Sequence, residues 1–277
     1  MNAKILGRAL ADAGIAAHEL TPLPELAAAL TPTPSYFALT RGADTPTPIY
    51  VLPVAADALI GTWERLRMLT DVTGQYPVIL GGARSVYAHY THLTDARRRL
   101  SPADQVRAAA RIDARTWLDT HWSAYFDADD DFGEADVRGE WTNPVYDLTR
   151  DPRETLASEI LGYKPDATQY IALVETVYSW EVPAHLNYGG WNACPAPAVH
   201  VALQRHWAER WGSEIVAATF DTLVCRTRAP LIDRDTALAL ARDHMMYCDD
   251  IVMQGTGTLD ALAAELITHQ SWFFWWD

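Results

Sequence analysis

The sequence predicts an α+β fold, with a mixed or antiparallel sheet flanked by helices. Hydrophobic residues make up 49% of the 277 positions, so the chain can bury a sizeable core. Short apolar runs bounded by glycine and proline alternate with longer segments of helical periodicity. Residues 214–228 contain two such runs around a turn, and the strands of this hairpin must pair antiparallel. Together these observations predict helices packed on a sheet.

The amino-terminal part, residues 1–130, is predicted to be an α/β region. Ser101 at a cap position and Pro102 at the first helical position mark the start of its last helix. In order, we expect a helix within the first thirty residues that Gly14 interrupts, a hairpin of residues 36–40 and 48–54, a helix over 55–72, a strand over 76–80 and a helix over 101–122.

Residues 131–167 lose this periodicity and contain Asp, Gly and Pro, so we expect a linker there. A carboxy-terminal α+β domain is predicted over 168–277. Its expected elements are a strand over 169–177, a helix over 197–211, the 214–228 hairpin, helices over 235–248 and 259–269, and a last strand over 271–277. That last segment is so rich in aromatic residues that we expect a strand buried on both faces.

The charge balance excludes some partners and favours others. The chain carries 22 Lys and Arg against 36 Asp and Glu, a formal net charge of −14 at pH 7. Because such a surface repels phosphate backbones, we expect no nucleic-acid binding. Arg107, Arg111 and Arg115 recur at helical spacing, which predicts one solvated helix face. An acidic surface favours solubility, or docking onto a protein partner with a basic surface.

Cysteine usage and the first residues predict a cytoplasmic location. The three cysteines have no C-x-x-C spacing, so neither a disulfide framework nor a cysteine-only zinc site is expected. The first residues lack the apolar stretch of a signal peptide. No window approaches about 18 uninterrupted apolar residues, so we expect no membrane span.

Several uncommon sequence words occur in the same order within roughly residues 168–277. They are Gly189-Gly190-Trp191-Asn192-Ala193-Cys194-Pro195, Tyr247-Cys248-Asp249-Asp250 followed by Gln254-Gly255, and Trp272-Phe273-Phe274-Trp275-Trp276-Asp277. In these words the chain resembles the DUF4253 family, a domain of unknown function found mostly in bacteria. The resemblance implies a bacterial protein and carries with it no reaction, ligand or cofactor. The chain departs from the family pattern at Asp243, where that pattern has glutamate, and at Asp249, where it has proline.

The first candidate site is the end of the predicted 235–248 helix. His244 and Cys248 stand four residues apart on one helix face, and Asp250 follows them. These side chains could supply three metal ligands or a Cys/His nucleophile pair. They also fall on the apolar stripe of the helix, where cysteine is normally inert and histidine is simply hydrogen-bonded. We therefore predict no metal site and name no cofactor, although metal binding by the three residues stays open.

The second candidate site is the 189–192 loop, which follows a strand and precedes a helix. Ligands commonly bind at such a position in open α/β sheets. Gly190 permits unusual backbone conformations, Trp191 offers a stacking face and Asn192 offers an amide. With Gln254, these are the predicted ligand-binding residues. A tight turn that buries Trp191 in the core would explain the same residues.

Two functions fit these observations, and the sequence leaves open whether the protein is an enzyme. We favour a non-catalytic protein-binding factor, of accessory or immunity type, with an acidic and aromatic-rich surface, because no catalytic signature occurs. The alternative is a small-molecule enzyme with its pocket between the 189–192 loop and the helix end, where His244 is the general base and Asp250 orients it. Convergence of both groups on one cavity would favour the enzyme, whereas burial of His244 against the sheet would favour binding.

Overall fold

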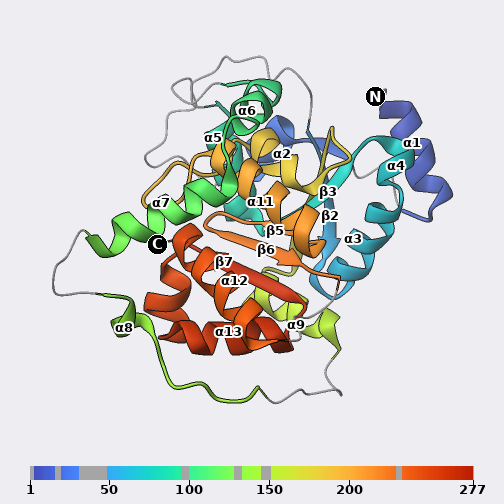
Figure 1. Ribbon diagram of the computed structural model, residues 1–277. Coiled ribbons are helices and arrows are strands. Elements are labelled where there is room, and N and C mark those ends of the chain that lie inside the picture. The colour runs from blue at the N-terminus through green and yellow to red at the C-terminus, as the bar shows by residue number, and fades with distance from the viewer. Residues whose placement is uncertain are drawn as a thin grey trace.

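A computed structural model of the chain describes seven stretches of it, which comprise residues 3–15, 20–30, 49–94, 100–127, 133–144, 151–228 and 233–276. In these stretches helices surround one central sheet (Figure 1). None of the described helices is long and apolar enough to cross a membrane. The first half of the predicted amino-terminal hairpin, residues 36–40, lies outside the described residues.

Seven strands form the sheet, in the order β1-β2-β4-β3-β5-β6-β7. Their bounds are Thr21–Pro22 for β1, Tyr50–Ala55 for β2, Tyr76–Gly81 for β3, Thr168–Val174 for β4, Glu214–Ala218 for β5, Thr222–Arg226 for β6 and Ser271–Trp275 for β7. Among the described strands, every neighbouring pair is antiparallel except β3 and β5, which are parallel. The predicted α+β class with a mixed sheet is confirmed, and the predicted carboxy-terminal hairpin is β5 with β6.

The described helices are mostly short and lie around this sheet. The α-helices are α1 Ala3–Asp12, α2 Leu23–Leu30, α3 Leu59–Met68, α4 Thr70–Thr73, α5 Ala83–Thr94, α6 Pro102–Ala109, α7 Ala114–Asp127, α8 Glu134–Val137, α9 Pro152–Leu161, α10 Val182–Leu186, α11 Pro197–Trp211, α12 Arg234–Tyr247 and α13 Leu259–Thr268. Two 3₁₀ turns, η2 at Ala56–Ala58 and η4 at Ser179–Glu181, and one π-helical turn, η5 at Ile251–Thr256, complete the set.

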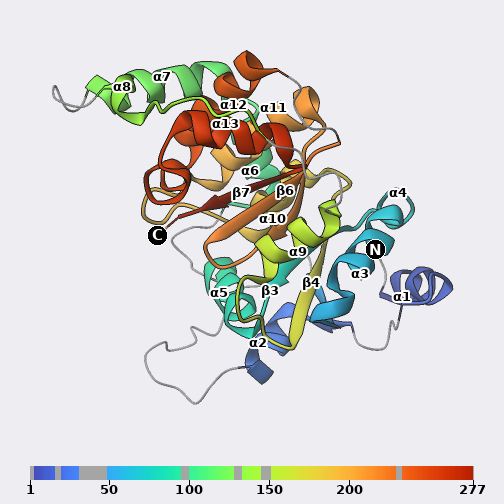
Figure 2. The ribbon, with the colours of Figure 1, turned by 90° about the horizontal axis from the view of Figure 1, so that it is seen from below.

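The edge strand β7 shows how helices cover both faces of the sheet. Because side chains alternate along a strand, Trp272 and Phe274 point to one face, where both rings contact His244 of α12. On the opposite face, the Ser271 hydroxyl donates to Oε1 of Glu159 in α9 at 2.8 Å. Figure 2 shows α12 and α9 on the two sides of β6 and β7.

Burial on both faces was predicted for all of β7, and this is wrong at its outer positions. Phe273 is 40% exposed and Trp275 is half-buried, whereas Trp272 and Phe274 are buried. The physical reason is that β7 ends the strand order, so its α9 side is covered only near Ser271.

The single helix expected over residues 101–122 is also wrong. The chain forms α6 and α7 instead, with a break at residues 110–113. Asp113 causes the break, because its Oδ1 accepts the Thr116 N–H at 2.7 Å and so starts a new helix. Arg107 and Arg115 therefore lie on different helices, although both are exposed as predicted.

The sheet joins the parts of the chain that are predicted to be separate domains. β4 pairs on one side with β2 and on the other with β3, so a strand from beyond residue 167 lies between two amino-terminal strands. In the predicted linker, α9 packs on β6 and β7. The division into domains at 1–130, 131–167 and 168–277 stays a prediction.

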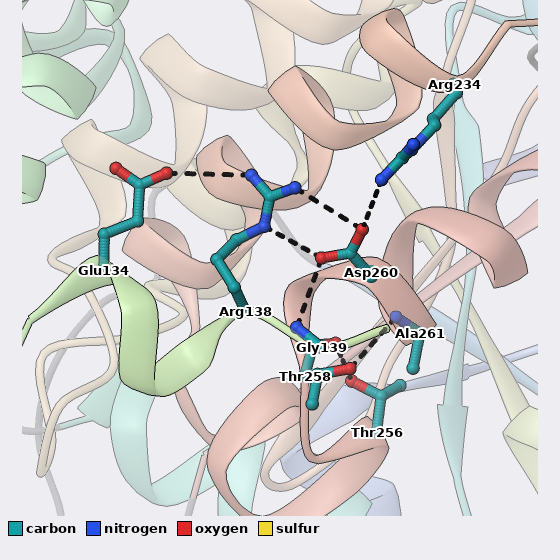
Figure 3. Close-up of polar contacts among 8 residues, drawn as sticks. All are labelled: Glu134, Arg138, Gly139, Arg234, Thr256, Thr258, Asp260 and Ala261. Carbon is teal, nitrogen blue, oxygen red and sulfur yellow. Dashed lines mark hydrogen bonds and ion pairs between the residues drawn. The ribbon is translucent and has the colours of Figure 1, made fainter. Parts of the chain in front are cut away.

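The buried carboxylate of Asp260 binds another part of that predicted linker, residues 138 and 139. Asp260, at the start of α13, is 1% exposed. Arg138 Nε and the Gly139 N–H donate to its Oδ2 at 2.8 and 3.2 Å, and Arg234 donates to its Oδ1 at 3.2 Å (Figure 3). Burial works to raise the pKa of Asp260, but these donors lower it below its usual value. The charge is therefore satisfied by the fold and holds the 133–144 segment against α13.

Candidate functional site

The loop between α10 and α11 depends on backbone conformations that few residues adopt. Gly189 has a φ of 100°, and a Cβ at this position would lie 2.0 Å from the carbonyl oxygen of Pro195 and 2.5 Å from Nε2 of His200. Only glycine therefore fits there. The Gly190 N–H donates to the carbonyl oxygens of Cys194 and Pro195 at 3.1 and 2.8 Å, which closes the loop on itself.

Trp191 and Asn192 lie on the outer part of this loop. The half-buried Trp191 ring lies 4.9 Å from the ring of His92 in α5 and 5.0 Å from that of Tyr188. Asn192 is exposed and has a φ of 44°. Trp191 thus packs the loop against α5, and the Asn192 side chain is accessible to solvent.

Behind the loop lies a buried network of polar side chains that was not predicted from the sequence. Cys194 Sγ lies 3.4 Å from Nε2 of His200, and Nδ1 of His200 is hydrogen-bonded to the Tyr247 hydroxyl. Gln204 donates to the same hydroxyl at 3.3 Å and accepts from the Cys225 thiol at 3.3 Å. Burial lowers the pKa of His200 to about 3, so the ring is neutral at pH 7. This network connects Cys194 in the loop to Tyr247 at the end of α12.

His244, the predicted general base, is 1% exposed and lies against the sheet. Its ring centroid is 5.0 Å from that of Trp207, 4.6 Å from Trp272 and 4.8 Å from Phe274. Its Nε2 has no hydrogen-bond partner among the described residues. Burial lowers the pKa of His244 to about 3, so it is a weak base at neutral pH.

Cys248, one turn further along, has a structural partner. Its thiol donates to the carbonyl oxygen of Trp275 at 2.8 Å and so ties the end of α12 to β7. Burial raises the pKa of this thiol to about 12, so a thiolate is not formed at neutral pH. Among the described residues, no group of three or more His, Cys, Asp and Glu side chains is arranged to hold a metal ion.

A cavity of about 250 Å³ opens beside the edge strand β7. It is lined by residues of β7, η5 and α13, together with single residues of α9 and α12. Those that bear on its chemistry are Glu159, His244, Asp250, Glu265, His269, Trp272, Phe273 and Trp275. We call it the carboxylate pocket. No arginine or lysine is among the described residues that line it.

Desolvation acts on one carboxyl that lines the carboxylate pocket, that of Glu265. Glu265 retains solvent exposure, yet nearby protein raises the pKa of its carboxyl above its usual value. No described residue forms an ion pair with it. Asp250, which also lines the pocket, accepts a hydrogen bond from the Gln254 side chain. Desolvation, and secondarily the charge of Asp250, also raises the pKa of the neighbouring Asp249.

A family model matches the region that contains most of these features, although Glu159 and His92 lie outside it. Residues 170–277 match DUF4253, a domain of unknown function. The resemblance inferred from the sequence words is therefore confirmed for this part of the chain. No curated protein and no solved structure matches the chain.

The DUF4253 region brings together only some of the residues predicted as a site. His244 and Asp250 line the carboxylate pocket, with Gln254 hydrogen-bonded to Asp250. Trp191 and Asn192 do not line it. Glu265 was missed because it lies on the solvent side of an ordinary amphipathic helix, and no sequence signal distinguishes it. Trp275 and Phe273 were noticed, but only as parts of a buried strand.

Proposed function

We propose that the protein is a binding protein whose carboxylate pocket receives a basic side chain of a partner. The observation that carries this proposal is the composition of one cavity. Carboxylates from three separate elements, Glu159 in α9, Asp250 before η5 and Glu265 in α13, line it together with the aromatic residues of β7. Ammonium and guanidinium groups are attracted both to carboxylates and to aromatic faces.

The dimensions and the charge of the molecule support the same conclusion. A volume of about 250 Å³ suits one long side chain better than a whole metabolite, since pockets for drug-sized ligands measure about 300–1,000 Å³. The exposed Phe273 and the half-buried Trp275 provide apolar surface for the stem of a lysine or arginine. A net charge of −14 attracts a basic partner over longer range.

A catalytic use of this pocket is the alternative. The pKa of about 3 at His244 supports binding over general base catalysis, because such a group takes up protons poorly at neutral pH. The assignment to an accessory or immunity-type factor, and the absence of nucleic-acid binding, stay predictions.

The test is calorimetric titration with a matched pair of short peptides. One carries a central arginine and the other carries citrulline, which has nearly the same shape without the charge. We expect the arginine peptide to bind at least about tenfold more tightly, since a charge-assisted hydrogen bond contributes about 1.5–3 kcal/mol. Equal binding of the two peptides would contradict the proposal.

A matched pair of variants assigns the binding to the pocket. Glu265→Gln should weaken the binding of the arginine peptide and leave the binding of the citrulline peptide unchanged. Glu25→Gln removes the same charge from an exposed position on α2 and should change neither. If both variants weaken binding equally, the effect comes from net charge and the pocket is not the site.

A further inference from the structure

A second cavity, of about 700 Å³, lies between α3, α9 and the base of the β5–β6 hairpin. Four arginines line it, one on α3, one on α9 and two at the end of β6 and just after it, together with two glutamates. These residues are Arg67, Arg153, Arg226, Arg228, Glu64 and Glu214. We call it the arginine pocket. It combines residues of the DUF4253 region with residues that precede it.

Glu214 holds two of the arginines in place. Its side chain is only 18% exposed, and it accepts from Nε of Arg67 at 2.7 Å and from Nε of Arg226 at 2.6 Å. The Arg226 guanidinium also lies 4.5 Å from the centroid of the Trp63 ring. Burial works to raise the pKa of Glu214, but the two guanidinium groups lower it below its usual value. The two guanidinium groups are therefore positioned before any ligand arrives.

The other two arginines stand at the rim. Arg153 pairs with Glu64 at 2.9 Å and is more than half exposed. Arg228 is exposed and forms no ion pair with a described residue; its side chain lies over Gly212, where a Cβ would be 3.1 Å from its Cδ. Two more positive than negative side chains thus line this cavity, in a chain whose net charge is −14.

We propose that the arginine pocket binds a small molecule that carries a phosphomonoester group. Its excess of two positive charges matches the dianion of such a group, and guanidinium forks match phosphate oxygens in geometry. The volume falls within the range of small-molecule sites and exceeds what a bare phosphate fills. Pro152, Leu156 and Met68 supply apolar wall for the rest of the molecule.

The test is calorimetric titration of the full chain with phenyl phosphate at about pH 7.5, where the second ionisation of a phosphomonoester is nearly complete. Phenol and benzoate, which carry no charge and one charge, are titrated alongside. We expect phenyl phosphate to bind at least about tenfold more tightly than either. If benzoate binds as tightly as phenyl phosphate, or if neither anion binds better than phenol, the proposal is overturned.

Variants locate the binding. Arg228→Gln and Arg153→Gln change exposed side chains, so both variants should fold. Each should weaken the binding of phenyl phosphate about tenfold. Arg205→Gln, an exposed arginine on α11 that pairs with Glu209, is the control and should leave binding unchanged. Loss in the control equal to that in the two pocket variants would show a general charge effect and overturn the assignment. Glu265→Gln should also leave phenyl phosphate binding unchanged, because it lies in the other pocket.

Discussion

Two pockets of opposite charge share Ser271 as a lining residue. In the arginine pocket, charge is organised by counter-ions, since Glu214 holds Arg67 and Arg226 at hydrogen-bond distance. In the carboxylate pocket, no arginine or lysine is among the described lining residues, and desolvation raises the pKa of Glu265. One site therefore has arginines already paired with a buried carboxylate, and the other contains a carboxyl, that of Glu265, whose pKa is raised by desolvation.

Desolvation of a carboxylate has opposite outcomes in the two pockets. At Glu214 the ion pairs outweigh desolvation, so the ionised carboxylate stabilises the fold. At Glu265 desolvation is not offset, so ionisation carries a cost that a basic ligand would relieve. The first arrangement suits an anion-binding site that is preorganised, and the second suits capture of a cation.

The largest expected effect comes from removing β7, whose first residue, Ser271, lines both pockets. Deletion of residues 271–277 removes the buried rings of Trp272, Phe274 and Trp276. A single core aromatic contributes about 3–5 kcal/mol, so the loss should approach the whole stability of a typical domain. Circular dichroism should show no cooperative melting. Phe273→Ser, at an exposed position of the same strand, should still melt cooperatively; a deleted protein that melts like the full chain would contradict this account of β7.

Glu214→Gln should destabilise the protein by about 2–3 kcal/mol at pH 7, because it weakens two charge-assisted hydrogen bonds of a mostly buried carboxylate. The pKa of Glu214 is lowered on folding, so its contribution is complete above the usual carboxyl pKa and is lost as the pH falls through the lowered value. Urea unfolding of both proteins between about pH 7 and pH 3 measures this. A difference that stays constant over that range would show that Glu214 does not act through its charge.

How far the sequence alone could predict this molecule depends on the range of the interactions. Helix α11 was predicted correctly because Pro197 begins it and Gly212 ends it, both of which are local signals. The break at Asp113 was missed, since capping by one aspartate competes with a continuous helical pattern.

The pockets could not be predicted for a different reason. Glu159 and Glu265 are 106 positions apart and meet only through the packing of α9 and α13 around β7. Likewise, the contact of Cys194 with His200 depends on the left-handed backbone at Gly189. His244 and Asp250 were predicted as one site because they lie only six positions apart at the end of one helix, and both do line the carboxylate pocket.

The smallest expected change in stability is at Glu265, and its sign is opposite to that of Glu214→Gln. Because its pKa is raised on folding, ionisation destabilises the folded state, and the cost appears as the pH rises through the carboxyl range. Glu265→Gln should therefore be slightly more stable than the parent at pH 7, by no more than about 0.5 kcal/mol at this exposed position, and equally stable near pH 3. Thermal melting at the two pH values checks the sign. A variant that is less stable at pH 7 would show that the Glu265 carboxylate has a favourable partner in the fold.

The most direct test of the proposed function is the pKa of the Glu265 carboxyl itself, measured by NMR with and without N-acetylarginine amide. Without ligand, the pKa should lie above the usual value for glutamate. A saturating concentration of the arginine probe should lower it, because a guanidinium placed beside the carboxylate favours its ionised form. N-acetylcitrulline amide should leave it unchanged. A pKa that does not move with the arginine probe, or that moves equally with citrulline, would contradict cation binding in the carboxylate pocket.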